Sequence, residues 1–158
     1  NTFHKGNQDV AMYPVDYTND PYVIGENDNI VSINSCIEVD LTGQLTAESI
    51  GYSLFSGSGG QVDFLRGAKR SKGGISIIAM PSTARGGELS RIVPVLKEGS
   101  VVTTGRNEVD YIVTEFGIAR LRGKTVAERA LALISIAHPD FREELEEAAR
   151  RMFPYLRK

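Results

Sequence analysis

The stretch SGSGGQVD, residues 56–63, is the local feature of the sequence best suited to chemistry. Glycines before a helix let a ligand approach backbone N–H groups that no side chain shields, and the helix dipole favours negative charge there. The stretch therefore fits the binding of an anion or oxyanion. The alternative is a tight strand-to-helix connection in which glycine supplies a positive φ. A P-loop and a dinucleotide-binding loop are disfavoured, because no Lys-Ser or Lys-Thr follows and the third glycine is absent.

A second loop, PSTARGG at residues 81–87, follows an apolar run and carries an arginine. Open α/β sheets bind ligands at the carboxyl ends of their strands, which is where this loop is expected. The planar guanidinium of Arg85 suits phosphate oxygens, and the hydroxyls of Ser82 and Thr83 add hydrogen-bonding groups. The loop is thus a candidate phosphate contact. The alternative is an arginine that is simply solvated.

Other reactive residue types give weaker indications. Acidic residues in strand-like settings could act as general bases, but no spacing shows that two of them meet; they are Glu38, Asp40, Asp63 and Glu115. Cys36 lies in an apolar segment, so we expect a small buried residue rather than a nucleophile. With one Cys and 2 His, the chain has too few clustered ligands for a structural zinc site.

Length and composition bound the class of protein. The chain has 158 residues, of which 41% are hydrophobic and 24% charged, as expected for one globular domain. Its net charge of −2 lacks the excess that nucleic acid or anionic lipid would demand. A single cysteine cannot form an internal disulfide and suits a reducing cytoplasm. No apolar stretch approaches the ~20 residues of a membrane span, and the start at Asn1 predicts a chain that begins inside a longer protein.

Short segments rich in apolar or β-branched residues predict a sheet. The run GISIIAM, residues 74–80, is typical of a central strand that helices bury on both faces. RIVPVL, residues 91–96, is expected at an edge because Pro94 cannot donate a ladder hydrogen bond. Further strands are expected at residues 29–34, 37–41 and 109–114.

Helical spacing appears at three places. Val62, Leu65 and Ala68 predict a helix after the first glycine-rich loop. Thr125 and Glu128 have the spacing of a capping box before a second helix, and Asp140 and Glu143 repeat that spacing before a third, which Pro154 ends. Residues 1–28 are interpreted as a surface connection, with a turn at Asn19-Asp20-Pro21 before a candidate short helix, and residues 29–158 as an α/β core.

Five segments together resemble the C-terminal domain of the acetyl-CoA hydrolase/transferase family, and most of all 4-hydroxybutyrate and butyrate:acetate CoA-transferases. They are VSINSCIEVDLTGQ, SGSGGQVDFLRGA, MPSTARGGELSRIVP, VDYIVTEFGIARLRGKT and AERALALISIAHPDF. The motifs run in family order from about Tyr17 to Phe141. The resemblance implies an open, mostly parallel α/β sheet with flanking helices, of the CoA-transferase and sugar-phosphate-isomerase type.

The resemblance also implies an activity. Enzymes of this family transfer CoA between carboxylic acids through a glutamyl-CoA thioester and need no metal. The family's glutamate lies upstream of the segment that matches Asn19 and Pro21, so we expect it before residue 1, in an N-terminal domain absent from this chain. Glu38, in IEVD, and Glu115, in VTEFG, do not match that nucleophile. The isolated chain is therefore expected to be inactive.

Site residues follow from the motifs, position by position. Asn19 matches an asparagine near the active site. Gly60 matches a glycine whose backbone N–H faces the reacting thioester carbonyl, where negative charge develops and a fixed donor is needed. Arg85 matches a basic residue, often lysine, that contacts the phosphate portion of CoA. The residues expected to bind CoA are Gly59, Gln61, Ser82, Thr83 and Arg85.

The sequence therefore predicts one domain of an acyl-CoA:carboxylate CoA-transferase, with acetate and 4-hydroxybutyrate or butyrate as acids and coenzyme A as the substrate thioester. Its expected partners are acyl-CoA, short-chain carboxylates and its own N-terminal domain, without nucleic acid or membrane, and a homo-oligomer stays open. An acetyl-CoA hydrolase is the nearest alternative. A non-catalytic regulatory module that binds CoA or a nucleotide is the alternative of another class.

Overall fold

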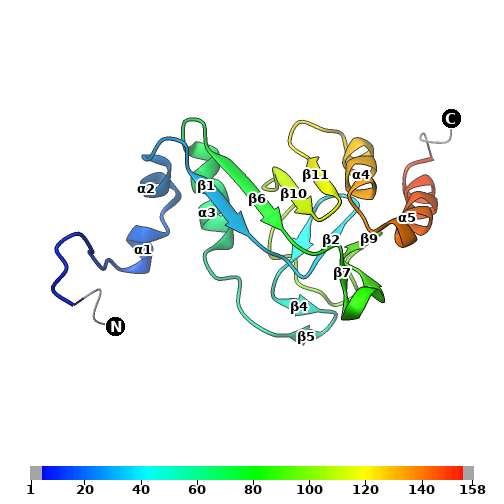
Figure 1. Ribbon diagram of the computed structural model, residues 1–158, viewed down its shortest axis with the longest axis horizontal. Helices are drawn as coiled ribbons and strands as arrows, with labels where there is room; N and C mark the ends of the chain where they lie inside the picture. Colours follow the sequence, from blue (N-terminus) through cyan, green and yellow to red (C-terminus); the bar gives the residue numbers. More distant parts are fainter. Residues whose placement is uncertain (1–4, 155–158) are drawn as a thin grey trace.

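The computed structural model describes residues 5–154, and a four-stranded sheet forms its centre (Figure 1). The order is β1-β6-β10-β11; the first three strands are parallel, and β11 is antiparallel to β10. The fold class is therefore α/β with a mostly parallel sheet, as predicted. The strands are β1 (Val31–Asn34), β6 (Ile75–Ala79), β10 (Tyr111–Thr114) and β11 (Gly117–Arg120).

The predicted central strand is β6, which lies between β1 and β10. Helices cover one face of this sheet, where α3 (Gln61–Arg70) packs against β1 and β6 and α4 (Val126–Ser135) packs against β11. Ser76 and Ile78 point to that face and are buried. Figure 1 looks onto β1 and β6 with α3 behind them. Ile75 points the other way and is 40% exposed, so the prediction of burial on both faces is wrong for residues 5–154.

A second, smaller sheet carries much of the hydrophobic core. Its order is β3-β2-β9, with β2 antiparallel to β3 and parallel to β9. Val39, Leu45 and Ile92 are completely buried in it. The strand predicted at residues 91–96 is shorter than expected but lies at an edge, as Pro94 indicated. The strands are β2 (Glu38–Asp40), β3 (Leu45–Thr46) and β9 (Ile92–Val93).

The N-terminal segment is more than a surface connection. After α1 (Val15–Thr18), Asp20 accepts a hydrogen bond from the Tyr22 N–H and begins α2 (Pro21–Gly25). Ile24 of α2 is buried, and a Cβ on Gly67 of α3 would overlap it. The helix thus packs closely on α3 and belongs to the folded body, because an apolar side chain and a glycine complement each other across the contact.

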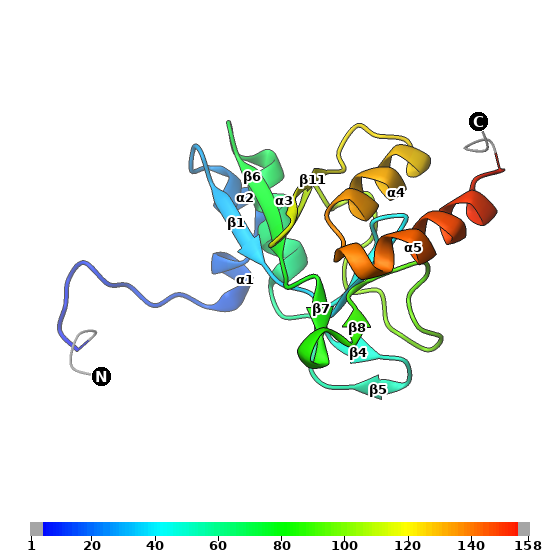
Figure 2. The ribbon, with the colours of Figure 1, turned by 45° about the vertical axis from the view of Figure 1, so that its right-hand side comes forward.

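The two C-terminal helices begin differently. Thr125 and Glu128 form the predicted capping box, in which each side chain bonds the backbone N–H of the other residue. In α5 (Pro139–Met152), the N-cap is His138, whose ring accepts a hydrogen bond from the Asp140 N–H. The cap predicted at Asp140 is therefore wrong by two positions. α4 and α5 pack against each other (Figure 2). No described helix is long and apolar enough to cross a membrane.

Two short hairpins project together from the body (Figure 2). The first pairs β4 (Ser49–Ile50) with β5 (Ser53–Leu54). The second pairs β7 (Thr83–Ala84) with β8 (Leu89–Ser90), and the 3-10 turn η1 (Arg85–Gly87) forms its tip. The second predicted loop, PSTARGG, is therefore largely this hairpin.

Candidate functional site

The structure brings Asn19 and Gly60 together. Asn19 ends α1, and Gly60 is the N-cap residue of α3. A Cβ on Gly60 would overlap the amide nitrogen of Asn19 and would lie 3.4 Å from the Phe64 ring. Only glycine allows this approach, so the Gly60 backbone and the Asn19 amide present one combined polar surface at the start of α3.

The positive φ of this loop lies one residue earlier than Gly60. Gly59 has φ +55° with open space around it, whereas Gly60 has φ −88°. Gly59 is thus needed for backbone conformation and Gly60 for close approach. The positive φ that the structural alternative predicted therefore belongs to Gly59, and the predicted helix after the loop is confirmed as α3.

Gln61 turns away from the loop surface. Its side-chain amide donates to the Thr104 hydroxyl at 2.9 Å, and the residue is 8% exposed. The side chain therefore ties α3 to the following part of the fold. What Gln61 offers at the loop is its backbone, in the first turn of a 10-residue helix whose dipole favours negative charge.

The second loop opens onto a cavity of about 500 Å³. Charged side chains at its wall are Arg85, Arg91, Lys97 and Glu38. Arg91 donates to the Cys36 carbonyl at 3.4 Å, while its Nε and one Glu38 carboxylate oxygen are buried without a hydrogen-bond partner among the described residues. The charged side chains at the cavity wall therefore have an excess of positive charge.

Arg85 takes an unusual backbone conformation at the tip of the hairpin. Its φ is +50°, a region that costs a side-chain-bearing residue about 1 to 2 kcal/mol. Gly86 and Gly87, which follow it, also have positive φ values of +69° and +102°. The loop thus holds Arg85 in a strained turn at the cavity wall, as is common where a side chain has a functional role.

Ser82 lies at the base of this hairpin and is completely buried. Its N–H donates to Glu115 at 2.9 Å and its hydroxyl at 2.6 Å. The hydroxyl bond is the main cause that lowers the pKa of Glu115 below its usual value of 4.5. Thr83 is half-buried in β7, opposite Ser90. Of the predicted phosphate contacts in this loop, only Arg85 lines the cavity.

Asn19, Gly59, Gly60 and Gln61 do not contribute to this cavity. Asn19 instead lines a shallower hollow of about 310 Å³ together with Asp63. Cys36 is buried as expected, with its sulfur 3.2 Å from that of Met80, and burial raises the pKa of its thiol to about 12. In residues 5–154, no group of three or more His, Cys, Asp or Glu side chains is placed to hold a metal.

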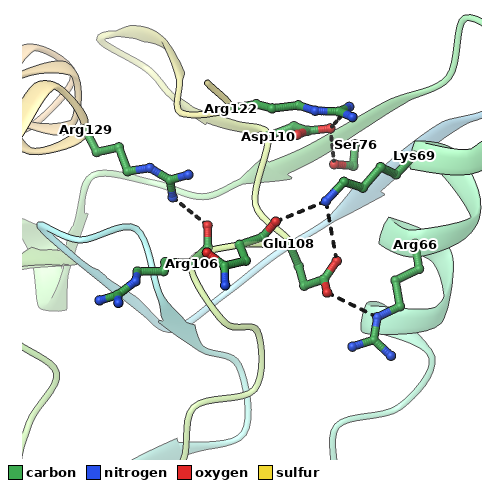
Figure 3. A network of polar contacts seen from close by, with 9 residues as sticks. Arg66, Lys69, Ser76, Arg106, Glu108, Asp110, Arg122 and Arg129 are labelled. Atoms are coloured by element: carbon green, nitrogen blue, oxygen red, sulfur yellow. Dashed lines mark hydrogen bonds and ion pairs between the residues drawn. The ribbon is translucent and has the colours of Figure 1, made fainter. Parts of the chain in front are cut away.

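A polar network that the sequence did not reveal fixes the far end of α3 (Figure 3). Glu108 lies 3.4 Å from Arg66 and 3.9 Å from Lys69, both on α3. Lys69 also donates to the Asn107 carbonyl at 3.1 Å. The loop before β10 therefore holds the helix that carries Gly60 at its other end.

The same loop is tied to the sheet and to α4 (Figure 3). Asp110, which is buried, accepts from Ser76 of β6 at 3.2 Å and faces Arg122 at 3.5 Å. Arg129 of α4 donates to the Arg106 carbonyl at 2.5 Å. Contacts of this kind join residues far apart in sequence, so no local pattern could have indicated them.

Comparison with known proteins supplies the family. A family model described as the acetyl-CoA hydrolase/transferase C-terminal domain matches residues 1–149. The 4-hydroxybutyrate coenzyme A transferase of Clostridium kluyveri is 60% identical over 96% of this chain and 35% of its own. Succinyl-CoA:cyclohexane-1-carboxylate CoA transferase of Geobacter metallireducens is 59% identical over 95% of this chain and 34% of its own.

A solved structure agrees with these matches. The 4-hydroxybutyrate CoA-transferase of Porphyromonas gingivalis has a TM-score of 0.79 and 59% identity, over 96% of this chain and 34% of that one. The chain thus spans about a third of the length of the relatives it matches. Because the family model matches nearly all of its residues, this chain belongs to the acetyl-CoA hydrolase/transferase family, whose C-terminal domain it represents.

Proposed function

We propose that this chain is the C-terminal domain of an acyl-CoA:carboxylate CoA-transferase that exchanges CoA between acetate and 4-hydroxybutyrate or butyrate. The observation that carries the proposal is the contact between Gly60 and the Asn19 amide. The resemblance assigns each residue to the active site separately, and they lie in different segments of the chain. Their meeting supports a single site at the start of α3.

In this proposal, a glutamate outside residues 1–158 attacks the carbonyl carbon of acyl-CoA and expels CoA thiolate, which leaves a mixed anhydride. The thiolate then attacks the glutamyl carbonyl, so that a glutamyl-CoA thioester forms and the first carboxylate leaves. A second carboxylate reverses the two steps. Each addition places negative charge on a carbonyl oxygen. The Gly60 N–H donates to that oxygen, and removal of one such donor costs about 2.7 to 4 kcal/mol in other enzymes.

The Asn19 amide has a positioning role beside Gly60 in this scheme. Its nitrogen lies close to where a Cβ on Gly60 would be, so the amide limits the space beside the glycine backbone. Gly59 and Gln61 contribute to CoA binding through backbone N–H groups, since the Gln61 side chain bonds Thr104. No metal takes part.

The CoA phosphates are assigned to the cavity beside the second hairpin. Arg85, Arg91 and Lys97 line it and can neutralise the charge of a multiply charged anion. Ser82 acts on this site indirectly, because its two hydrogen bonds to Glu115 hold the base of the hairpin. Thr83 continues the strand that positions Arg85. We place the protein in the cytoplasm, in line with its single buried thiol.

The test is an assay of the full-length gene product with acetyl-CoA and either butyrate or 4-hydroxybutyrate. We expect the corresponding acyl-CoA to form at the rate at which acetyl-CoA disappears, and residues 1–158 alone to form none. Release of free CoA without acyl-CoA would favour the hydrolase. Binding of CoA with neither product would favour the regulatory module. Product formation by residues 1–158 at the full-length rate would contradict a nucleophile outside this chain.

A further inference from the structure

One face of the four-stranded sheet is apolar and uncovered by the described chain. Val31 and Ile33 of β1 are 55% and 66% exposed, and Ile118 of β11 is 68% exposed. Side chains alternate along a strand, so the residues between them face α3 and α4 instead. The exposed face, which we call the open face, consists of Val31, Ile33, Ile75, Ile77, Ala79, Tyr111, Val113 and Ile118, with Arg120 at its edge.

The strand register makes the open face continuous. Ile33 pairs with Ile77, and Ile77 pairs with Tyr111, so these three side chains form one row across the sheet. Val113 pairs with Ile118 in a neighbouring row. The apolar residues therefore lie side by side over all four strands, which distinguishes them from the scattered exposed apolar residues of an ordinary surface.

An open apolar face is unusual for strands that pair in parallel. Parallel sheets are covered by helices on both faces, and their strands read as continuous apolar runs for that reason. The run GISIIAM has this composition, although β6 is covered on one face only. In addition, the outer edge of β1 pairs with no other described strand. Both features indicate a sheet that is complete only with further polypeptide.

We propose that the open face is the docking surface for the apolar side of a helix from the same polypeptide, outside residues 1–158. The relatives supply the argument for this occupant, because this chain aligns over 95% and 96% of its length with proteins about three times as long. The proposal rests on the proposed function in one respect, since both take the full-length protein to be about three times as long as this chain. A second copy of this chain is the rival occupant.

Cysteine labelling of the full-length protein tests the docking surface. Ile33→Cys and Ile118→Cys place one thiol at each side of the open face, and Leu131→Cys, on α4 at a position that is 51% exposed, is the matched control. Every variant also carries Cys36→Ala, because denaturing urea would expose the buried Cys36 thiol and add its reaction to the reference rate. Each variant is labelled with a maleimide in buffer and, as its own reference, in denaturing urea.

We expect Ile33→Cys and Ile118→Cys to react at least about 10-fold more slowly than in urea, at any protein concentration, while Leu131→Cys reacts at a rate close to its reference. Rates at both positions within about twofold of the urea values would overturn the proposal. Protection that disappears on dilution would also overturn it, in favour of a second copy.

The CoA-transfer assay on the unlabelled variants separates this proposal from the proposed function. Protected thiols in a protein without transfer would contradict the function and leave the docking surface standing. Reactive thiols in a protein that transfers CoA would overturn the docking surface alone.

Discussion

The two glycine-containing loops of this domain use the same residue type for different reasons. In the first loop, Gly60 has an ordinary negative φ but no room for a side chain, because Asn19 lies against it. In the second loop, Gly86 and Gly87 have open space around them and positive φ values. The first loop thus requires glycine for closeness to a polar neighbour, and the second requires it for the shape of the backbone.

The two loops are also anchored to the rest of the fold in different ways. The first loop feeds α3, whose far end is held by Glu108 and Asn107. The second loop is the free tip of a hairpin that is fixed at its base through Ser82 and Glu115. Substitutions should therefore affect catalysis at the first loop and ligand binding at the second.

The largest effect is expected for Gly60→Ala in the full-length enzyme. The new Cβ must displace the Asn19 amide and obstructs the thioester carbonyl, so we expect kcat to fall about 10- to 100-fold with a smaller change in KM for acyl-CoA. The fold should lose little stability, because the displaced group is the end of a flexible side chain. Steady-state kinetics and thermal unfolding of the same preparation measure the two effects.

Asn19→Ala together with Gly60→Ala is the matched control for that displacement. With the amide gone, the added methyl group has room, so a kcat of the double variant below that of Asn19→Ala alone reports obstruction of the substrate. A normal kcat in Gly60→Ala, combined with a clearly lowered Tm, would remove Gly60 from the active site.

The next effect is expected for Gly59→Ala, and it should appear in stability. Its φ of +55° suits glycine, so alanine should lower the free energy of unfolding by about 1 to 2 kcal/mol. Nothing lies within 4 Å of the new methyl group, so kcat in the folded protein should stay near the original value. Urea unfolding measures the loss. A large kcat defect in Gly59→Ala without destabilisation would show that Gly59 is needed for catalysis and not only for the backbone conformation of the loop.

A smaller effect is expected for Arg85→Glu, and it should appear in KM. Reversing one of the cavity's charges should raise KM for acyl-CoA about fivefold and weaken its salt dependence, with kcat little changed. Arg85→Lys keeps the charge and should retain most of the affinity, which makes it the matched control. Unchanged KM for acyl-CoA in Arg85→Glu would assign Arg85 to the solvated alternative.

The smallest effect is expected for Ser82→Ala, which removes the hydroxyl bond to Glu115. We expect a loss of about 0.5 to 1 kcal/mol at pH 7, which is less than usual for a bond to a charged group because solvent reaches Glu115. Since the folded-state pKa of Glu115 is lowered, its contribution is present above pH 4.5 and is lost as pH falls through the lowered pKa.

The difference in unfolding free energy between Ser82→Ala and the unmodified protein should therefore be constant between pH 7 and about pH 5 and shrink at lower pH. Urea unfolding at several pH values measures it. A difference that grows on acidification would mean that Glu115 is not the group that Ser82 stabilises.

Local patterns predicted those parts of the fold that local contacts determine. Thr125 and Glu128 lie within one helical turn, so their spacing alone was sufficient for the capping box. The strand β11 was missed, because Gly117 to Arg120 lacks a strong alternation and takes its conformation from pairing with β10. The covering of β6 on both faces was predicted wrongly for residues 5–154, because an apolar run shows that a strand can be buried but not which segment covers it.

The candidate site was less accessible to sequence reasoning than the fold. Residue type showed that Ser82 could donate a hydrogen bond but not that its hydroxyl points at Glu115. The meeting of Asn19 with Gly60 depends on how α1 and α2 pack beside α3, which no spacing reveals. Arg91 and Lys97 lie outside the motif around Arg85 and join it only through the folding of β9 and its following loop.

The pairing of β2 with β9 has a consequence for how this domain acquires its fold. Val39 and Ile92 meet across roughly 50 intervening residues, and β1 finds β6 over a similar separation. The chain must close these long loops, and bear the entropy that this costs, before the completely buried side chains contribute any stabilisation. Folding is therefore expected to take longer than that of a helical bundle, whose contacts are mostly local. During that interval the apolar strands remain unpaired and are open to association with other chains.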